Sequence, residues 1–316
     1  MKELFVPILL LIIGFVLLIE GADFFVEACS SIAKRFHIPS IIIGLTIVAM
    51  GTSLPECAVS VTASIADNNA LAVSNAVGSN IFNLMVVCGA CALFTPLIVT
   101  KGTLRKDFPI SIVCAILLLG LAFLIPGSHG TVGRVGGSIM LAVFTAYLIS
   151  MIVEARKNPM TVEEDYELLP TWKCILFILG GAAAIKFGGD AVVNGASAIA
   201  SRFGLSDELI GLTIVALGTS LPELVTSLVA SKKGEVDMAV GNVIGSNIFN
   251  LLLVLGVASV ISPITISLSN VYDTVILVAV SVLVWLFAWS KERITRLEGA
   301  LMLLIYGGYM VYICMR

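Results

Sequence analysis

Two glutamates lie in otherwise uncharged stretches of the sequence and share the same surroundings. Glu56 ends the run Gly44-Leu-Thr-Ile-Val-Ala-Met-Gly-Thr-Ser-Leu-Pro-Glu56, and Glu223 ends a second run, 167 positions later, that matches it at twelve of thirteen positions. In both runs the proline before the glutamate has no N–H, so the carbonyl four residues back loses its helical partner. A carboxylate beside freed carbonyls is a set of oxygen ligands that hard cations prefer. The two runs therefore predict a cation site.

Further residues, most of them with oxygen in the side chain, recur around both glutamates at helical spacing. Steps of three and four residues place each set on one face of its helix. On the glutamate-bearing helices, these sets are Thr46, Ala49, Ser53, Glu56 and Ser60, and Thr213, Ala216, Ser220, Glu223 and Ser227. On the following helices they are Asn75, Ser79 and Asn83, and Asn242, Ser246 and Asn250. Two helix pairs thus offer four stripes of hydroxyl, amide and carboxyl oxygens.

Each motif also has a purely structural interpretation. A single Gly-Thr-Ser-Leu-Pro-Glu segment fits a kinked helix whose glutamate reaches toward the membrane surface. Stripes of Ser and Asn can serve as hydrogen bonds between neighbouring helices. A charge at the centre of a membrane costs at least about 2.5–3.5 kcal/mol on insertion scales. Finding that charge twice favours a functional role for the glutamates, whereas both interpretations stay open for the asparagines.

The chain that must position these residues is too apolar for a soluble domain. Its 316 residues are 59% hydrophobic and 12% charged, whereas soluble chains carry about 25% charged residues. Segments of roughly 20 apolar residues can span a bilayer. Ten such segments lie near 4–26, 38–66, 71–97, 107–125, 132–154, 173–196, 207–231, 237–261, 271–290 and 296–315. The sequence predicts an all-α polytopic membrane protein in a lipid bilayer. Its net charge of −3 gives no basic surface for nucleic acid, and no protein partner is evident.

The repeat extends beyond the glutamate runs and sets the architecture. Gly-Ser-Asn-Ile-Phe-Asn at 78–83 recurs unchanged at 245–250, with the same displacement of 167 residues. We expect a first five-helix repeat over 1–154, a cytoplasmic linker over 155–171 and a second five-helix repeat over 172–316. Because five is odd, the second copy enters the membrane from the opposite side. The result is two inverted five-helix repeats, an architecture typical of secondary transporters with a substrate site near the midplane.

The distribution of basic residues predicts the orientation. Loops after odd-numbered spans hold thirteen of the eighteen Lys and Arg, the opposite side holds four, and Lys186 lies within a span. Cytoplasmic loops carry the excess of Lys and Arg. We therefore expect a multi-pass protein of a plasma or inner membrane with both termini outside the cytoplasm.

At these motifs the chain resembles a known family. The paired Gly-Thr-Ser-Leu-Pro-Glu and Gly-Ser-Asn-Ile-Phe-Asn segments resemble the two alpha repeats of sodium/calcium exchangers, in the calcium/cation antiporter superfamily. The resemblance to prokaryotic-type members covers essentially the whole chain. It implies that Glu56 and Glu223 hold calcium together with the backbone carbonyls of Thr52 and Thr219. It further implies that the sodium sites are completed by Ala49, Ser53, Ser79, Ala216, Ser220 and Ser246, with Asn83 and Asn250 in the central layer.

The function implied is antiport of Na⁺ against Ca²⁺ by alternating access, with the ions as substrates, no cofactor and no enzymatic reaction. With both glutamates ionised, an empty site carries two negative charges, which are costly in a medium of low dielectric constant. One Ca²⁺ or two Na⁺ cancel them, so loaded carriers cross readily and the empty carrier crosses poorly. The family pattern implies three sodium ions per calcium, whereas two carboxylates account for two. The ratio therefore stays open.

Some alternatives also remain. Several family members, including potassium-dependent ones, have Asp where this chain has Asn250, which argues against potassium co-transport. Proton-coupled calcium exchange is the close rival, although the Gly-Asn-x-x-Glu signature typical of that branch is absent from the second predicted helix. A channel would need a continuous pore and would pass ions without a counter-ion. An intramembrane enzyme would need a nucleophile paired with a His, and both His37 and His129 lie in connecting segments.

Overall fold

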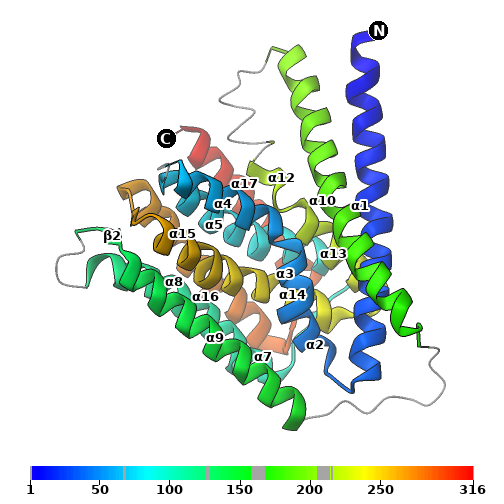
Figure 1. The fold of residues 1–316 in the computed structure, drawn as a ribbon, viewed down its shortest axis with the longest axis horizontal. Helices are drawn as coiled ribbons and strands as arrows, with labels where there is room; N and C mark the ends of the chain where they lie inside the picture. The colour runs from blue at the N-terminus through cyan, green and yellow to red at the C-terminus, as the bar shows by residue number, and fades with distance from the viewer. Residues whose placement is uncertain are drawn as a thin grey trace.

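The structure, a computed structural model, describes residues 2–66, 69–124, 129–157, 168–204, 214 and 216–315. Within them the regular secondary structure is helical apart from four two-residue strands (Figure 1). Eight of the described helices are long and apolar enough to cross a membrane, and a bent pair of shorter helices makes up to nine spans. The remaining expected span, near 207–231, lies partly outside the described residues and is represented by α12 (Ala216–Gly218) and α13 (Leu221–Lys232). The prediction of an all-α membrane protein is confirmed.

The longest helices are α1 (Lys2–Arg35) and α10 (Thr171–Arg202), which lie side by side over much of their length (Figure 1). Both run past the ends expected from hydropathy, because their last turns carry basic residues that the apolar pattern does not include. Glycines permit the close approach. A Cβ atom on Gly14 would lie 2.8 Å from the carbonyl oxygen of Gly188, and the reverse distance is also 2.8 Å. These two helices open the two repeats, so their pairing joins the halves.

The second span is broken as its proline predicts. Its segments are α2 (Ser40–Ile43), the π-helical turn η1 (Gly44–Val48), α3 (Ala49–Thr52) and α4 (Leu54–Ile65). The first half, Ser40–Thr52, and α4 meet at an angle of 50°. Pro55 falls in the first turn of α4, the position in a helix that proline favours. Pro222 has the same position in α13, so both glutamate-bearing helices begin again just before the acid.

The third and eighth spans form the interior of the bundle and share one construction. The third consists of α5 (Asn69–Phe82), η2 (Asn83–Val87) and α6 (Cys88–Phe94). The eighth consists of α14 (Val236–Phe249), η4 (Asn250–Val254) and α15 (Leu255–Ile261). The π-helical turns begin at Asn83 and Asn250, which are equivalent in the repeat. Single π-helical turns inside α-helices are frequent at functional sites.

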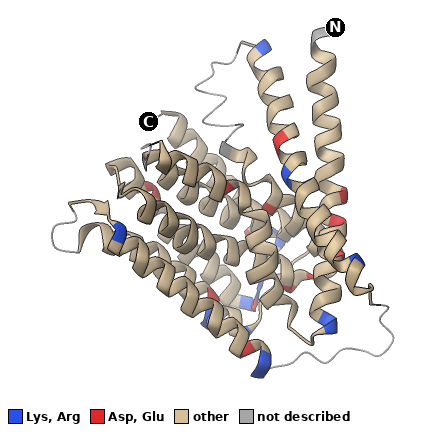
Figure 2. Cartoon of the chain, viewed as in Figure 1, with Lys and Arg blue, Asp and Glu red and all other residues tan. Residues whose placement is uncertain are grey.

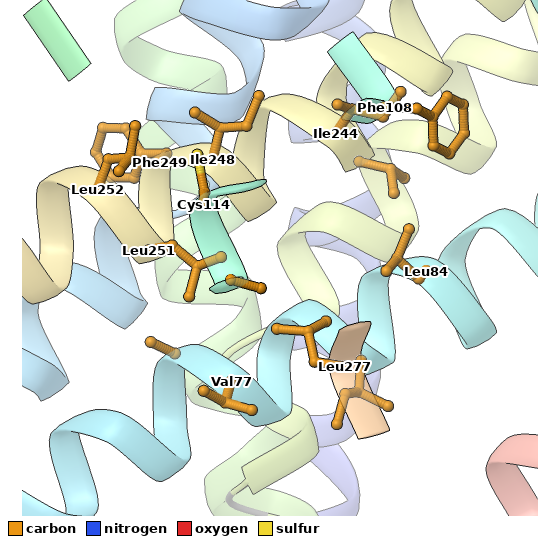
Figure 3. Packing of buried hydrophobic residues seen from close by; sticks show 14 of the residues in the cluster. Val77, Leu84, Phe108, Cys114, Ile244, Ile248, Phe249, Leu251, Leu252 and Leu277 are labelled. Atoms are coloured by element: carbon orange, nitrogen blue, oxygen red, sulfur yellow. The ribbon is translucent and has the colours of Figure 1, made fainter. Parts of the chain in front are cut away.

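The remaining helices surround this interior. They are α7 (Lys101–Arg105), α8 (Asp107–Phe123), α9 (Arg134–Lys157), α16 (Leu268–Lys291) and α17 (Arg296–Met315). Apolar side chains of α5, α8, α14 and α16 pack together, among them Val77, Phe108, Ile244 and Leu277 (Figure 3). Because lipid tails are as apolar as these side chains, tight packing rather than escape from water holds such helices together.

The pairing of the four short strands is consistent with two halves of opposite orientation. β1 (Leu97–Ile98) pairs antiparallel with β4 (Arg293–Ile294), and β2 (Thr131–Val132) pairs with β3 (Ile264–Thr265). β1 and β3 are equivalent in the repeat, yet each pairs with a strand of the other half. One membrane-spanning helix separates the strands within each half, α8 between β1 and β2 and α16 between β3 and β4. Two copies of opposite orientation give this exchange of partners.

The charged residues lie mostly away from the centre of the bundle. Lys and Arg gather toward the end of the molecule where α1 and α9 finish, whereas both chain termini lie toward the other end (Figures 1 and 2). A half-buried ion pair, Lys233 with Asp23 at 2.9 Å, fastens α1 to the turn after α13. The few acidic residues in the interior therefore stand apart from this peripheral charge.

Candidate cation site

Both repeated glutamates are completely buried. Glu56 lies in the first turn of α4 and Glu223 in the first turn of α13, and each has 0% of its surface exposed. The free N–H groups at a helix N-terminus carry partial positive charge, which stabilises a carboxylate there. Neither glutamate reaches the membrane surface, so the interpretation of a kinked helix with a surface-seeking acid is wrong.

Each glutamate accepts a hydrogen bond from the other half of the molecule. The hydroxyl of Ser53 donates to Oε1 of Glu223 at 2.7 Å, and the hydroxyl of Ser220 donates to Oε1 of Glu56 at 3.1 Å. Ser79 also donates to Oε1 of Glu56, at 3.4 Å. Ser53 lies between α3 and α4, and Ser220 lies between α12 and α13, and both have backbone angles outside the helical range. The breaks thus bring the predicted residues of both repeats together in one place.

The first asparagine of each stripe holds the glutamate-bearing helix to its neighbour. Asn75 Nδ2 donates to the backbone oxygen of Glu56 at 3.2 Å and to Ser60 at 3.0 Å. Asn242 Nδ2 lies 3.5 Å from the backbone oxygen of Glu223 and donates to Ser227 at 2.9 Å. These contacts support the structural interpretation of Asn75 and Asn242 as bonds between helices.

The other predicted residues lie close to these groups where they are described. Thr52 is buried, donates to Oδ1 of Asn242 at 3.1 Å and, like Ser246, faces the Glu223 carboxylate. Ala49 is buried against α14, so closely that a Cβ atom added to Gly245 would lie 2.8 Å from the Cβ of Ala49. Thr219 lies between α12 and α13. Thr213 and the side chain of Ala216 lie outside the described part of the chain.

A four-asparagine network crosses between the halves, and two of its members were missed by the sequence reasoning. Asn80 Nδ2 donates to the backbone oxygen of Asn247 at 3.0 Å, and Asn247 Nδ2 donates to that of Asn80 at 3.3 Å. Asn83 Nδ2 donates to Oδ1 of Asn247 at 3.3 Å, and Asn250 Nδ2 to Oδ1 of Asn80 at 3.2 Å. The available signal was the repetition of Asn80 and Asn247 within Gly-Ser-Asn-Ile-Phe-Asn.

Four buried oxygens at these residues have no hydrogen-bond partner. They are Oε2 of Glu56, Oε2 of Glu223, Oδ1 of Asn83 and Oδ1 of Asn250. An unpaired buried polar group costs about 1–3 kcal/mol and a charged one costs more. All four are acceptors, so cations suit them and anions do not. Carboxylate, amide and hydroxyl oxygens are the ligands that hard cations prefer.

Comparisons with known proteins agree with this chemistry. The sequence profile of the family described as "Sodium/calcium exchanger protein" matches residues 6–153 and 173–315. The chain is similar to "Putative antiporter CaxA" of Alkalimonas amylolytica, with 42% identity over 315 residues that cover 96% of this chain and 97% of the relative. It is 35% identical over 321 residues to "Inner membrane protein YrbG" of Escherichia coli, which covers 97% and 95% of the two chains.

The fold is also that of a solved exchanger. A structure of the sodium-calcium exchanger NCX_Mj, soaked with 10 mM Na⁺ and 10 mM Sr²⁺, superposes with a TM-score of 0.83 at 31% identity, covering 96% of this chain and 97% of that chain. The match confirms the predicted fold class, which is ten transmembrane helices arranged as two inverted five-helix repeats.

Proposed function

The chain belongs to the sodium/calcium exchanger family, and from this premise we propose that it exchanges Na⁺ for Ca²⁺ across the membrane by alternating access. Membership of the family makes it a multi-pass cation exchanger and not an enzyme. The identity of the coupling ion, the residues that bind the ions and the orientation in the membrane are parts of the proposal.

The observation that carries the proposal is the set of four unpaired acceptor oxygens. Oε2 of Glu56 and Oε2 of Glu223 would bind Ca²⁺ directly, helped by the backbone carbonyls of Thr52 and Thr219 at the helix breaks. Asn83 and Asn250 would contribute their free amide oxygens. The residues proposed to complete the sodium sites are Ala49, Ser53, Ser79, Ala216, Ser220 and Ser246. Broken backbone at membrane depth is typical of transporter ion sites.

Antiport would follow from the charge of this site. Both carboxylates are fully buried, and the hydrogen bonds that they accept come from neutral hydroxyls, those of Ser220 and Ser79 at Glu56 and that of Ser53 at Glu223. An empty, ionised site would therefore place two negative charges, with no cationic partner proposed for them, in a medium of low dielectric constant, where they are costly. One Ca²⁺ or two Na⁺ neutralises both. The loaded protein would rearrange between its two access states and the empty one would not, which couples the two ion movements.

We also propose the orientation given by the basic residues, with both termini outside the cytoplasm and a cytoplasmic linker over 155–171 between repeats at 1–154 and 172–316. The gathering of Lys and Arg at one end of the molecule supports it (Figure 2). The inner-membrane location in the name of the relative YrbG supports a cell membrane. Cys314, the exposed one among seven cysteines, tests the orientation. A membrane-impermeant thiol reagent should label it from outside intact cells, and labelling from the cytoplasmic side alone would reverse the assignment.

The decisive experiment measures uptake of radioactive calcium into proteoliposomes that contain the purified protein. Gradients of Na⁺, K⁺ and H⁺ are imposed separately. We expect the Na⁺ gradient to drive uptake and Glu56→Ala or Glu223→Ala to abolish it. Uptake driven by the H⁺ gradient alone would favour the rival in which the two glutamates carry protons. Uptake without any counter-ion gradient would identify a channel.

A further inference from the structure

We propose that Asn80 and Asn247 are positioning residues that hold the amides of Asn83 and Asn250 so that oxygen, rather than the NH₂ group, faces the transported cation. The inference rests on the proposed function, because the cation is the one assigned there. Asn80 and Asn247 would not bind the ion themselves. They would act through the two asparagines that end the same repeated segments.

The orientation of Asn80 and Asn247 is fixed first. Each side chain donates from Nδ2 to the other residue's backbone carbonyl, at 3.0 and 3.3 Å. A carbonyl oxygen can only accept, so turning either amide over would place two oxygens together and lose the bond. Both residues are buried, with 0% and 1% of their surfaces exposed, so solvent offers no replacement donor. Their Oδ1 atoms are thereby held in defined positions.

These Oδ1 atoms then fix the second pair of amides. Oδ1 of Asn80 accepts from Nδ2 of Asn250 at 3.2 Å, and Oδ1 of Asn247 accepts from Nδ2 of Asn83 at 3.3 Å. An amide whose nitrogen is held presents its oxygen on the other side. Oδ1 of Asn83 and Oδ1 of Asn250 are, among the buried side-chain atoms of the described residues, amide oxygens without a hydrogen-bond partner, and both residues are fully buried. A turned amide would instead direct N–H groups toward a cation, which repels them.

The consequence is a specific pairing between the halves. Asn80 on α5 sets the orientation of Asn250 on the eighth span, and Asn247 on α14 sets that of Asn83 on the third span. Partners that orient metal ligands typically contribute 10- to 100-fold in affinity, so we expect about tenfold or more from each positioning residue.

The test is a set of double substitutions read out by Ca²⁺ binding. Asn80→Leu removes the acceptor for Asn250 and should weaken Ca²⁺ binding by about tenfold or more. Asn250→Asp presents oxygen whichever way the side chain turns. Relative to Asn250→Asp alone, the double variant Asn80→Leu, Asn250→Asp should therefore lose little affinity. The control is Asn80→Leu combined with Asn83→Asp. It adds the same negative charge, but at a residue whose amide is held by Asn247 and not by Asn80. Relative to Asn83→Asp alone, this double variant should therefore still lose about tenfold or more in Ca²⁺ affinity.

The readouts separate positioning from general damage to the fold. Purified protein in detergent is titrated with Ca²⁺ alone while its thermal midpoint is followed, and the KM and maximal rate of uptake are measured in vesicles. If Asn80 positions Asn250, Asn80→Leu should raise the KM for Ca²⁺, and Asn250→Asp but not Asn83→Asp should restore the affinity. If Asn80→Leu only destabilises the fold, the thermal midpoint measured without Ca²⁺ should fall equally in the single variant and in both double variants. Ser281→Ala, which removes a buried hydroxyl bonded within α16, controls for destabilisation. If Asn80→Leu does not fold, Asn80→Ala takes its place, with the same pair-specific pattern expected.

Unchanged Ca²⁺ affinity in the Asn80 variant, or equal rescue by Asn250→Asp and Asn83→Asp, would overturn the proposal. Failure of the proposed function would look different. In that case the wild-type protein would show no Ca²⁺-dependent stabilisation, or Glu56→Gln would leave it unchanged.

Discussion

Replacing Glu56 by Gln removes one negative charge and one of the two carboxylate oxygens from the proposed ion site without changing the size of the side chain. The side chain keeps its size, and its Oε1 can still accept the hydrogen bonds from Ser220 at 3.1 Å and Ser79 at 3.4 Å. The atom that changes is Oε2, which is buried and has no partner within the protein. Any loss therefore reports the missing negative charge together with the ligand oxygen that the NH₂ group replaces, rather than a collapsed network.

The magnitude follows from the burial of the site. Removing one partner of a buried ion pair costs about 3–5 kcal/mol, which at about 1.4 kcal/mol per tenfold weakens Ca²⁺ binding by roughly 100- to 4,000-fold. A Na⁺ ion carries half the charge, so the same change should cost it about half that free energy and roughly 10- to 60-fold in affinity. The variant should thus lose far more affinity for Ca²⁺ than for Na⁺.

The assay titrates purified Glu56→Gln with each ion and follows its thermal midpoint, alongside calcium uptake into sodium-loaded vesicles. Glu27→Gln is the matched control, because Glu27 is half-exposed on α1 and lies 3.8 Å from Lys233. Glu27→Gln likewise removes one negative charge from a membrane helix, but at a position away from the proposed ion site. Wild-type Ca²⁺ affinity in Glu56→Gln would refute the assignment, and equal losses for Ca²⁺ and Na⁺ would refute the charge argument.

Three further results are expected. If two carboxylates set the stoichiometry, one Ca²⁺ exchanges for two Na⁺, and flux should not respond when the membrane potential is stepped; a response would contradict that count. Gly241→Ala should lower the thermal midpoint, because its Cβ would lie 2.5 Å from the backbone oxygen of Ile41, and overpacking costs about 1–3 kcal/mol. Gly307→Ala, with nothing described within 4 Å, is its control, and an equal drop in both would refute the packing argument. Ser53→Ala and Ser220→Ala should each weaken Ca²⁺ binding by about 10- to 100-fold, and a loss in only one of them would contradict their equivalent contacts.

The sequence located the interior acids because membrane burial makes charge rare and the repeat makes it recur. Glu56 and Glu223 stood out on those grounds, and the proline before each one predicted the break that the structure has in the second span. The inverted architecture followed from counting five spans per copy. These features depend on local composition and on the order of segments along the chain, which a single sequence records.

Contacts between the halves could not be read in the same way. Helical spacing groups residues of one helix, whereas Ser53 meets Glu223, and Asn80 meets Asn250, across 170 positions. The short strands were not predicted from the sequence for a similar reason. Each has two residues and forms only because its partner strand in the other repeat lies beside it. Their positions depend on how the helices pack, and neither propensity nor periodicity specifies that packing.

The symmetry of these contacts bears on selectivity. In both halves a serine hydroxyl bonds Oε1 of the opposite glutamate, and an asparagine oxygen bonds Nδ2 of the opposite amide. Each contact uses one end of a side chain and leaves an oxygen at the other end. Among the described residues, the free atoms of the two glutamates and of Asn83 and Asn250 are therefore all acceptors. If these atoms line the ion site as proposed, they would favour a cation over an anion, because they can only accept hydrogen bonds. Charge and coordination number, rather than donor chemistry, would then decide between Ca²⁺ and Na⁺, which is the choice an exchanger of these two ions must make.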